Sequence, residues 1–317
     1  MADHLLELSH LKQYFPVAGS KKVVKAVDDV SFFINKGETL GLVGESGCGK
    51  TTTARLLIQM YRQDSGKILY SDGLSEERME ISSMSKKNLR SYREKVKYIF
   101  QDPARSLNPR MNVLDILTAP LKYSSFNMTK GEMYGAAEKI IRETGLAPDT
   151  LMRRPAEFSG GQRQRISIAR GLIMNPELLI CDEIVSALDV SIQAQILDLL
   201  LSVRAERKLS LLFITHDLKI ASYFCDKIGV MFRGILVEEA PAKTLYKTQA
   251  HPYTKLLFEG ASKRLSNSSV EIKSAQEKES GCPFAYRCPH AASRCRNELP
   301  HFKTVADGHK VRCFANL

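Results

Sequence analysis

The chain has 317 residues, with 46 Lys and Arg against 35 Asp and Glu. That length allows about two domains with a sizeable core, and a composition of 44% hydrophobic and 26% charged residues excludes a disordered or collagen-like chain. No apolar run approaches the roughly twenty residues of a membrane-spanning helix, and residues 1–5 lack the pattern of a secretion signal. We therefore expect a cytosolic protein. The chain has a net charge of +11, but its sequence contains no block of five like charges. This pattern favours a basic solvated surface over a nucleic-acid site.

Three short apolar segments, 39–43, 178–181 and 211–214, predict buried parallel strands, because each is too short for a helix and is bounded by turn or polar residues. Helical periodicity follows the first segment over 50–58 and the second over 191–200. Strands that alternate with helices predict an α/β domain with a parallel sheet.

Residues 105–158 have a different pattern. Amphipathic helical stretches at 111–123 and 130–145 predict a helical insertion, which we expect to be broken by Pro109, Pro120 and Pro148. From about 262 to 281 the chain turns polar and Ser-rich, which predicts a linker before a small Cys-rich end.

The segment that follows the first predicted strand matches the P-loop pattern G-x-x-x-x-G-K-[ST]. It consists of Gly44, Glu45, Ser46, Gly47, Cys48, Gly49, Lys50 and Thr51. The strand before it and the helix after it supply the context that a P-loop needs. Its glycines let backbone N–H groups surround phosphate oxygens. We expect Lys50 to reach the β- and γ-phosphates and Thr51 to ligate Mg²⁺.

A carboxylate pair, Asp182 and Glu183, ends the second predicted strand. Ligands of open α/β sheets bind at the carboxyl ends of the strands. Successive residues there point in different directions, so Asp182 is expected to serve the Mg²⁺ ion while Glu183 polarises the attacking water. These features together predict a P-loop NTPase.

A further motif narrows the family. Ser159, Gly160, Gly161 and Gln162 precede a helical run that begins at Arg163. Here the chain resembles the ATPase subunits of ABC transporters, whose signature is usually LSGGQ; Phe158 replaces the Leu. In this family two subunits enclose ATP head to tail. The resemblance therefore implies that the signature residues act on nucleotide bound to the other subunit.

Other positions match the family in its usual order. Gln101 matches the Q-loop, His216 the switch histidine at the γ-phosphate, and Asp189 the D-loop at the dimer interface. Tyr14 would stack on adenine, with the adjacent Phe15 as the alternative. Thr52 extends the P-loop contacts, and Gln101 is expected to join Thr51 and Asp182 at the Mg²⁺ ion. One departure is Ile184, since the family normally has Pro after the carboxylate pair; we expect a freer turn at Glu183.

Two stretches resemble one branch of the family, the ATPases of oligopeptide, dipeptide and nickel importers. The first is Val185–Gln195, together with Arg105–Pro109; the second runs from His251–Thr254 to the Cys-rich end. The resemblance implies an α/β fold: a P-loop NTPase (RecA-like) ABC ATPase core with an antiparallel β subdomain, a helical subdomain and a small Cys-rich C-terminal extension. The implied divisions are an ATPase domain over 1–258 with its helical subdomain at about 102–162, a linker over 259–281, and a C-terminal region over 282–317.

Four of the seven cysteines lie near the C-terminus: Cys282, Cys288, Cys295 and Cys313. A reducing cytosol disfavours disulfides, so this cluster suggests a metal site. Zinc sites prefer closely spaced Cys pairs, which are missing here, whereas four thiolates suit an iron–sulfur cluster. The resemblance to the importer branch, some members of which carry a [4Fe–4S] cluster on a matching pattern, implies such a cluster here, with zinc or unliganded thiols as alternatives. The other three, Cys48, Cys181 and Cys225, are interpreted as ordinary buried residues.

The resemblance as a whole implies an ATPase subunit that powers peptide import from the cytoplasmic face of the membrane, where it is peripheral. Its implied partners are two transmembrane permease subunits, a second ATPase subunit that is a paralogue or a copy, and an extracytoplasmic substrate-binding protein, with no nucleic acid. The alternatives are a soluble ABC ATPase without a transport role and an importer of nickel or another solute.

Overall fold

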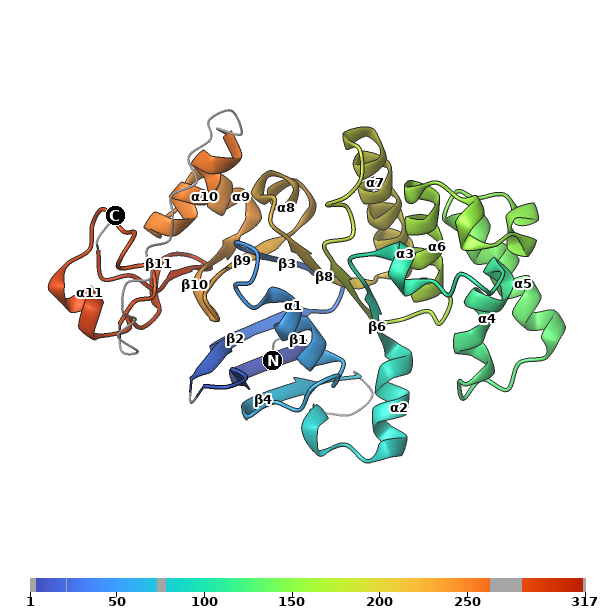
Figure 1. The fold of residues 1–317 in the computed structure, drawn as a ribbon, viewed down its shortest axis with the longest axis horizontal. Helices are drawn as coiled ribbons and strands as arrows, with labels where there is room; N and C mark the ends of the chain where they lie inside the picture. The colour runs from blue at the N-terminus through green and yellow to red at the C-terminus, as the bar shows by residue number, and fades with distance from the viewer. Residues whose placement is uncertain (1–3, 21, 73–77, 263–280, 316–317) are drawn as a thin grey trace.

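The computed structural model describes residues 4–20, 22–72, 78–262 and 281–315, whose strands form two sheets (Figure 1). The four-stranded sheet, in the order β2-β1-β4-β5, contains β1 (His4–Pro16), β2 (Val23–Asn35), β4 (Ser65–Tyr70) and β5 (Met79–Glu80). The eight-stranded sheet, in the order β11-β12-β10-β9-β3-β8-β7-β6, contains β3 (Thr39–Val43), β6 (Val96–Ile99), β7 (Leu178–Asp182), β8 (Ser210–Thr215), β9 (Lys227–Phe232), β10 (Ile235–Pro241), β11 (Lys303–Ala306) and β12 (His309–Val311).

The helices are, in chain order, α1 (Lys50–Leu57), α2 (Lys86–Lys95), α3 (Pro103–Ser106), α4 (Val113–Lys122), α5 (Lys130–Glu143), α6 (Gly160–Leu172), α7 (Val190–Arg207), α8 (Leu218–Phe224), α9 (Ala242–Lys247), α10 (Pro252–Ser262) and α11 (Ser293–Asn297). Short 3₁₀ helices lie at Ile81–Ser83, Pro148–Met152 and Pro155–Glu157. Among the described residues, no helix combines the length and the apolar character needed to cross a membrane.

The prediction of a parallel α/β core is confirmed. Strand β3 pairs in parallel with β8 on one side and β9 on the other, and β8, β7 and β6 continue the parallel order. All three apolar segments of the sequence form neighbouring interior strands of this sheet, in the order β3-β8-β7. Strand β3 is followed directly by the P-loop and α1, as the sequence predicts.

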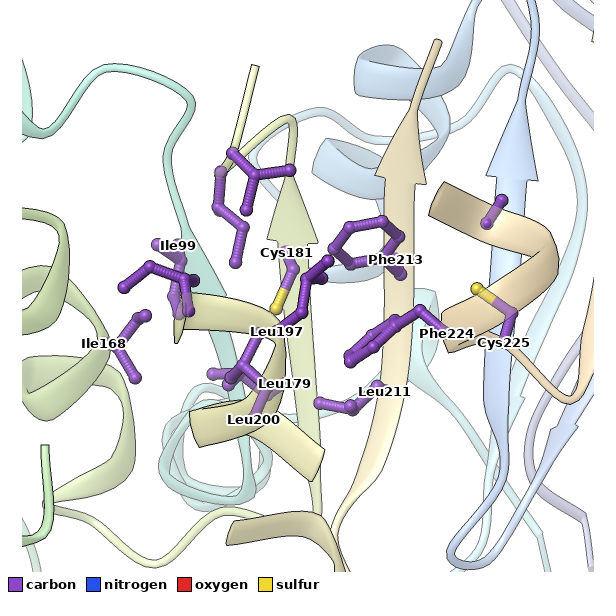
Figure 2. Packing of buried hydrophobic residues seen from close by; sticks show 14 of the residues in the cluster. Ile99, Ile168, Leu179, Cys181, Leu197, Leu200, Leu211, Phe213, Phe224 and Cys225 are labelled. Atoms are coloured by element: carbon purple, nitrogen blue, oxygen red, sulfur yellow. The ribbon is translucent and has the colours of Figure 1, made fainter. Parts of the chain in front are cut away.

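The central strands are continuously apolar because both faces of the sheet are buried. In β7, Leu178 and Ile180 face a core shared with the antiparallel sheet, whereas Leu179 and Cys181 face the opposite core. Figure 2 shows the second core, in which the side chains of β7 and β8 meet those of α7; the residues from these elements are Leu179, Cys181, Leu211, Phe213, Leu197 and Leu200. These two layers of packing hold the carboxyl ends of the strands in place.

The antiparallel sheet lies over one face of the core, with α1 between the two sheets (Figure 1). Helices α3 to α6 lie together at one end of the molecule, where the sequence predicts a helical subdomain, and the C-terminal strands lie at the other end. One prediction is wrong: Pro120 does not break the helix but lies inside α4. The proline removes only one intrahelical bond close to the helix end, where α4 stops two residues later.

The C-terminal region is joined to the ATPase core through a buried carboxylate. Glu238 of β10 is fully buried and accepts hydrogen bonds from the backbone N–H groups of Ala250 (2.7 Å) and His251 (2.9 Å). The ring of His309 in β12 lies 2.7 Å from the same carboxylate. Strands β12 and β11 thereby extend the main sheet beyond β10, which the sequence analysis does not predict. Most of the linker predicted over 259–281 lies outside the described residues.

Candidate functional site

The P-loop packs closely against neighbouring backbone at two positions, and at each of them only glycine fits. A Cβ at Gly44 would lie 2.1 Å from the carbonyl oxygen of Met231, and one at Gly49 would lie 2.1 Å from that of Ala26. No side chain fits at those distances. Gly47, by contrast, has a φ of 78° but nothing within 4 Å of an added Cβ.

This contrast yields a stability prediction. Gly47→Ala is expected to cost about 1 kcal/mol, from the left-handed backbone alone. Gly49→Ala is expected to cost about 1–3 kcal/mol more, because the new methyl group also displaces the backbone at Ala26. Urea unfolding of the two variants measures the difference. Equal losses would show that the contact with Ala26 relaxes freely.

Lys50 and Thr51 lie at the start of α1 and point toward the end of β7. The buried Lys50 amine donates to the carbonyl oxygens of Gly44 (2.8 Å) and Glu45 (3.0 Å). It also lies 4.0 Å from the carboxylate of Glu183. The hydroxyl of Thr51 donates to Asp182 Oδ1 at 3.1 Å. The structure therefore brings together the two P-loop side chains and the two carboxylates that the sequence selects.

Asp182 is buried at the carboxyl end of β7. Its Oδ2 accepts a hydrogen bond of 2.5 Å from the hydroxyl of Tyr98 in β6, a partner that the sequence analysis misses. Burial raises the pKa of Asp182 above its usual range, and the hydrogen bonds from Tyr98 and Thr51 oppose that rise. A buried carboxylate beside a hydroxyl is a fitting pair of oxygen donors for a divalent cation, since a cation compensates the buried charge.

Glu183 points into a group of polar side chains from three other elements. Its Oε2 accepts a hydrogen bond from the Gln101 amide at 3.0 Å and lies 3.6 Å from His216 Nδ1. Its backbone is left-handed, with φ 49°, and its N–H donates to the carbonyl of Ile214 in β8 at 3.0 Å. The two carboxylates at the strand end therefore diverge as expected, one toward Thr51 and the other toward Gln101 and His216.

The turn after Glu183 is held even though Ile184 replaces proline. Ile184 and Val185 are buried, with exposed fractions of 2% and 1%. The hydroxyl of Ser186 donates to the carbonyl oxygen of Glu183 at 2.9 Å, and its backbone N–H donates to the same oxygen at 3.2 Å. Burial and hydrogen bonding thus supply the restraint that the sequence analysis expects to be missing.

Tyr14 lies close to the P-loop along the antiparallel sheet. It pairs with Lys25 in β2, next to Ala26, whose carbonyl contacts Gly49. Its hydroxyl donates to Asp28 at 2.5 Å. The alternative aromatic, Phe15, packs edge-on against Tyr61 with ring centroids 5.5 Å apart. The stacking of Tyr14 on adenine, with Phe15 as the alternative, stays a prediction.

The signature motif forms the N-terminus of α6. Ser159 is the N-cap: its hydroxyl accepts from the Gln162 N–H at 3.3 Å, and the Gln162 side chain accepts from the Ser159 N–H at 3.0 Å. A Cβ at Gly161 would lie 2.7 Å from Ile192, near the start of α7, whose N-cap is Asp189. Phe158 is buried, in the position of the usual Leu. Across the described residues, no hydrogen bond or ion pair links the signature to the P-loop of the same chain.

The four C-terminal cysteines gather at one cavity. Cys282, Cys288, Cys295 and Cys313 line it together with His251 and His290. In the part of the chain that the structure describes, however, no three His, Cys, Asp or Glu side chains are arranged to hold one metal ion. Burial also raises the pKa of Cys282 to about 11, which favours its neutral thiol. The predicted iron–sulfur cluster, with zinc as its alternative, is therefore not supported, because spacing in sequence does not ensure that sulfur atoms converge on one point.

The three remaining cysteines fit their interpretation as buried residues. Cys48, Cys181 and Cys225 have exposed fractions of 4%, 0% and 7%. Burial raises the pKa of each of these thiols, so the neutral form is favoured. They pack within the two hydrophobic cores and belong to the structural framework of the site.

Comparison with known families agrees with this geometry. Residues 27–186 match the family described as ABC transporter, and residues 237–295 match the one described as Oligopeptide/dipeptide transporter, C-terminal region. The chain belongs to the ABC transporter family. The first match includes the P-loop, signature and carboxylate pair, and the second includes Glu238, His251 and three of the four C-terminal cysteines.

Curated relatives of this ABC transporter protein match almost its whole length. The oligopeptide transport ATP-binding protein AppF of Bacillus subtilis is 43% identical, over 98% of this chain and 97% of its own. The oligopeptide transport ATP-binding protein OppF is 44% identical in Bacillus subtilis and 40% in Haemophilus influenzae, in both cases over 99% of this chain and 97% of the relative.

Solved structures share the ABC ATPase fold. The ATP-binding cassette MJ0796, in a dimeric post-hydrolysis state bound to ADP and Pi, superposes with a TM-score of 0.67 at 24% identity, over 75% of this chain and 99% of its own. CbiO1 from Clostridium perfringens superposes with a TM-score of 0.66 at 23% identity, over 83% of this chain and 96% of its own. At these identities the likeness establishes the fold.

Proposed function

We propose that this chain is the ATP-hydrolysing subunit that powers peptide import through a membrane ABC transporter. The observation that carries the proposal is the near full-length similarity to AppF and OppF, which are named for oligopeptide transport. The match of residues 237–295 to the oligopeptide/dipeptide transporter C-terminal region supports the same branch. A soluble ABC ATPase without a transport role is not favoured by these relatives. An importer of nickel or another solute is a less favoured alternative for the same reason.

In this proposal, the nucleotide phosphates bind at the P-loop. Lys50, positioned by the carbonyl oxygens of Gly44 and Glu45, directs its ammonium at the β- and γ-phosphates, and the backbone N–H groups of the loop surround the phosphate oxygens. Thr51 and Asp182 would hold Mg²⁺, and the predicted third ligand, Gln101, is hydrogen-bonded to the carboxylate of Glu183. When bound, Mg²⁺ neutralises charge on the phosphate oxygens. Tyr14 stacks on the adenine, and Thr52 adds a contact in the first turn of α1.

Glu183 is the proposed general base. Its side chain is only 13% exposed, and its carboxylate is oriented by the hydrogen bond from Gln101. His216, 3.6 Å from this carboxylate, is the proposed contact of the γ-phosphate. This arrangement leaves the carboxylate an acceptor for a proton from water. The signature residues Ser159, Gly160, Gly161 and Gln162, together with Asp189, act on nucleotide bound to a second ATPase subunit. Among the described residues, the signature makes no hydrogen bond or ion pair with this chain's own P-loop, which is consistent with a role at the nucleotide of the second subunit.

The proposed assembly has two transmembrane permease subunits, a second ATPase subunit that is a paralogue or a copy, and an extracytoplasmic substrate-binding protein. The chain would be peripheral, at the cytoplasmic face of the membrane, with the helical subdomain of about residues 102–162 contacting a permease. The proposed domain boundaries are those of the sequence analysis: the ATPase domain ends at residue 258 and the linker ends at residue 281. An iron–sulfur cluster or zinc ion has no place in this proposal, because the cysteines are not arranged to hold one.

An affinity pull-down tests this function. The tagged chain is recovered from detergent-solubilised membranes of its host, and the captured proteins are identified by mass spectrometry. We expect two multi-spanning permeases, a second ATPase and a binding protein whose ligands are peptides. Recovery of soluble partners alone would contradict the transport role, and a binding protein specific for nickel would redirect the cargo.

A further inference from the structure

One P-loop residue, Glu45, is held at three separate atoms. Its backbone N–H donates to the hydroxyl of Tyr253 at 2.9 Å, and its carbonyl oxygen accepts from Lys50 at 3.0 Å. Its carboxylate accepts two hydrogen bonds from the guanidinium of Arg287, at 3.1 and 3.2 Å. Lys50 belongs to the P-loop itself, but the other two partners lie more than 200 residues away in the chain.

Both distant partners belong to the C-terminal part of the molecule. Tyr253 lies in the first turn of α10, and Arg287 lies between Cys282 and Cys288. No role in the ATP site follows from their sequence context. Their contacts with Glu45 nonetheless connect α10, near the end of the proposed ATPase domain, and the C-terminal region to the loop that binds phosphate.

An aromatic cluster holds these two partners in place. Tyr253 is fully buried, and its ring centroid lies 4.5 Å from that of Phe232 and 5.4 Å from that of Phe284. The Arg287 guanidinium lies 5.6 Å from the Phe284 ring and 6.0 Å from the Phe232 ring. Phe232 ends β9 in the ATPase core, whereas Phe284 belongs to the C-terminal region. The cluster therefore fixes both regions against each other beside Glu45.

The link reaches the nucleotide site through Lys50. Its amine is positioned by the carbonyl oxygens of Gly44 and Glu45, so a displacement of Glu45 also displaces a contact of Lys50. The charge of Glu45 also affects nucleotide binding, because an unpaired carboxylate in a phosphate-binding loop repels polyphosphate. The two-pronged contact with Arg287 neutralises that carboxylate and fixes its orientation.

We propose that Arg287 and Tyr253 are positioning residues of the nucleotide site. They act through Glu45, and the C-terminal region thereby sets the affinity of the P-loop for a nucleoside polyphosphate. The proposal rests on the proposed nucleotide site and is independent of peptide transport.

Calorimetric titration of the full chain with Mg²⁺-ADP tests this link, because ADP reports binding without hydrolysis. We expect Arg287→Gln to weaken ADP binding about two- to fivefold, the range of a partly exposed ion pair. In a Glu45→Gln background the same substitution is expected to have no measurable effect, because its partner charge is already gone. Tyr253→Phe, which removes one hydroxyl from a filled core position, is expected to weaken binding about two- to fivefold.

The matched control is Arg294→Gln. Arg294 lies in the same region and makes an equivalent two-pronged contact with Glu298, at 2.9 and 3.2 Å, away from the P-loop. It is expected to leave ADP affinity unchanged, even if it alters the melting temperature. Wild-type affinity for ADP in both Arg287→Gln and Tyr253→Phe would overturn the proposal. An equal loss of affinity from Arg287→Gln in the wild-type and the Glu45→Gln backgrounds would also overturn it. Failure of the wild-type chain to bind ADP would instead contradict the proposed ATPase function.

Discussion

Replacement of Glu183 by Gln is expected to lower ATP turnover about 10²–10⁴-fold, the contribution typical of a general base. Gln has nearly the same shape and can still accept the hydrogen bond from Gln101, so nucleotide binding is expected to persist. If two chains enclose ATP, they are expected to stay associated once hydrolysis is blocked. Phosphate release measures the first effect, and size-exclusion chromatography with and without ATP measures the second.

The control for this variant is Glu206→Gln on the exposed face of α7, where the carboxylate accepts a hydrogen bond from Ser202. It removes the same charge without touching the site, and its turnover is expected to match wild type. Unchanged turnover in Glu183→Gln would exclude this carboxylate as the base. Lost ADP binding in the same variant would mean that Glu183 organises the phosphate site as a whole.

Replacement of Asp182 by Asn is expected to weaken the dependence of nucleotide binding on Mg²⁺, with a loss in Mg²⁺ affinity of about 10–100-fold. The same substitution is expected to stabilise the ligand-free fold, although it weakens Mg²⁺ binding. Burial raises the pKa of Asp182, so folding favours the protonated carboxyl, and the ionised form destabilises the fold above that pKa. Stability therefore rises as the pH falls through the raised pKa, and the amide removes this dependence.

Thermal melts with and without Mg²⁺-ADP, over a range of pH, measure both effects. The expected result is a ligand-free Asp182→Asn protein that melts no lower than wild type at neutral pH but gains much less from Mg²⁺-ADP. Asp198→Asn, at an exposed position of α7, supplies a control for the loss of one negative charge. A variant that melts lower than wild type without ligand would show that the bonds from Tyr98 and Thr51 outweigh the burial of charge.

Local features of this protein could be predicted from its sequence. The P-loop and its flanking strand and helix depend on neighbouring residues, and the strand and the helix form as predicted. The helix after the signature motif also forms, but it begins at Gly160, with Ser159 as its N-cap. The features that could not be predicted depend on distant partners. Strands β11 and β12 have only four and three residues; β12 exists through pairing with β10, and β11 through pairing with β12. Tyr98 meets Asp182 only because β6 lies beside β7. The contact of Arg287 with Glu45 spans 242 residues.

The position of β3 at the centre of the parallel sheet also affects how the chain folds during synthesis. Both of its partners, β8 and β9, follow the helical subdomain in sequence. The residues between β3 and β8, 44–209, take on the order of ten to thirty seconds to synthesise. For that time β3 has no strand to pair with, whereas α4 to α6 can already pack together. We therefore expect newly made β3 to be the segment most prone to aggregation, and β3 to join the parallel sheet only when β8 has left the ribosome.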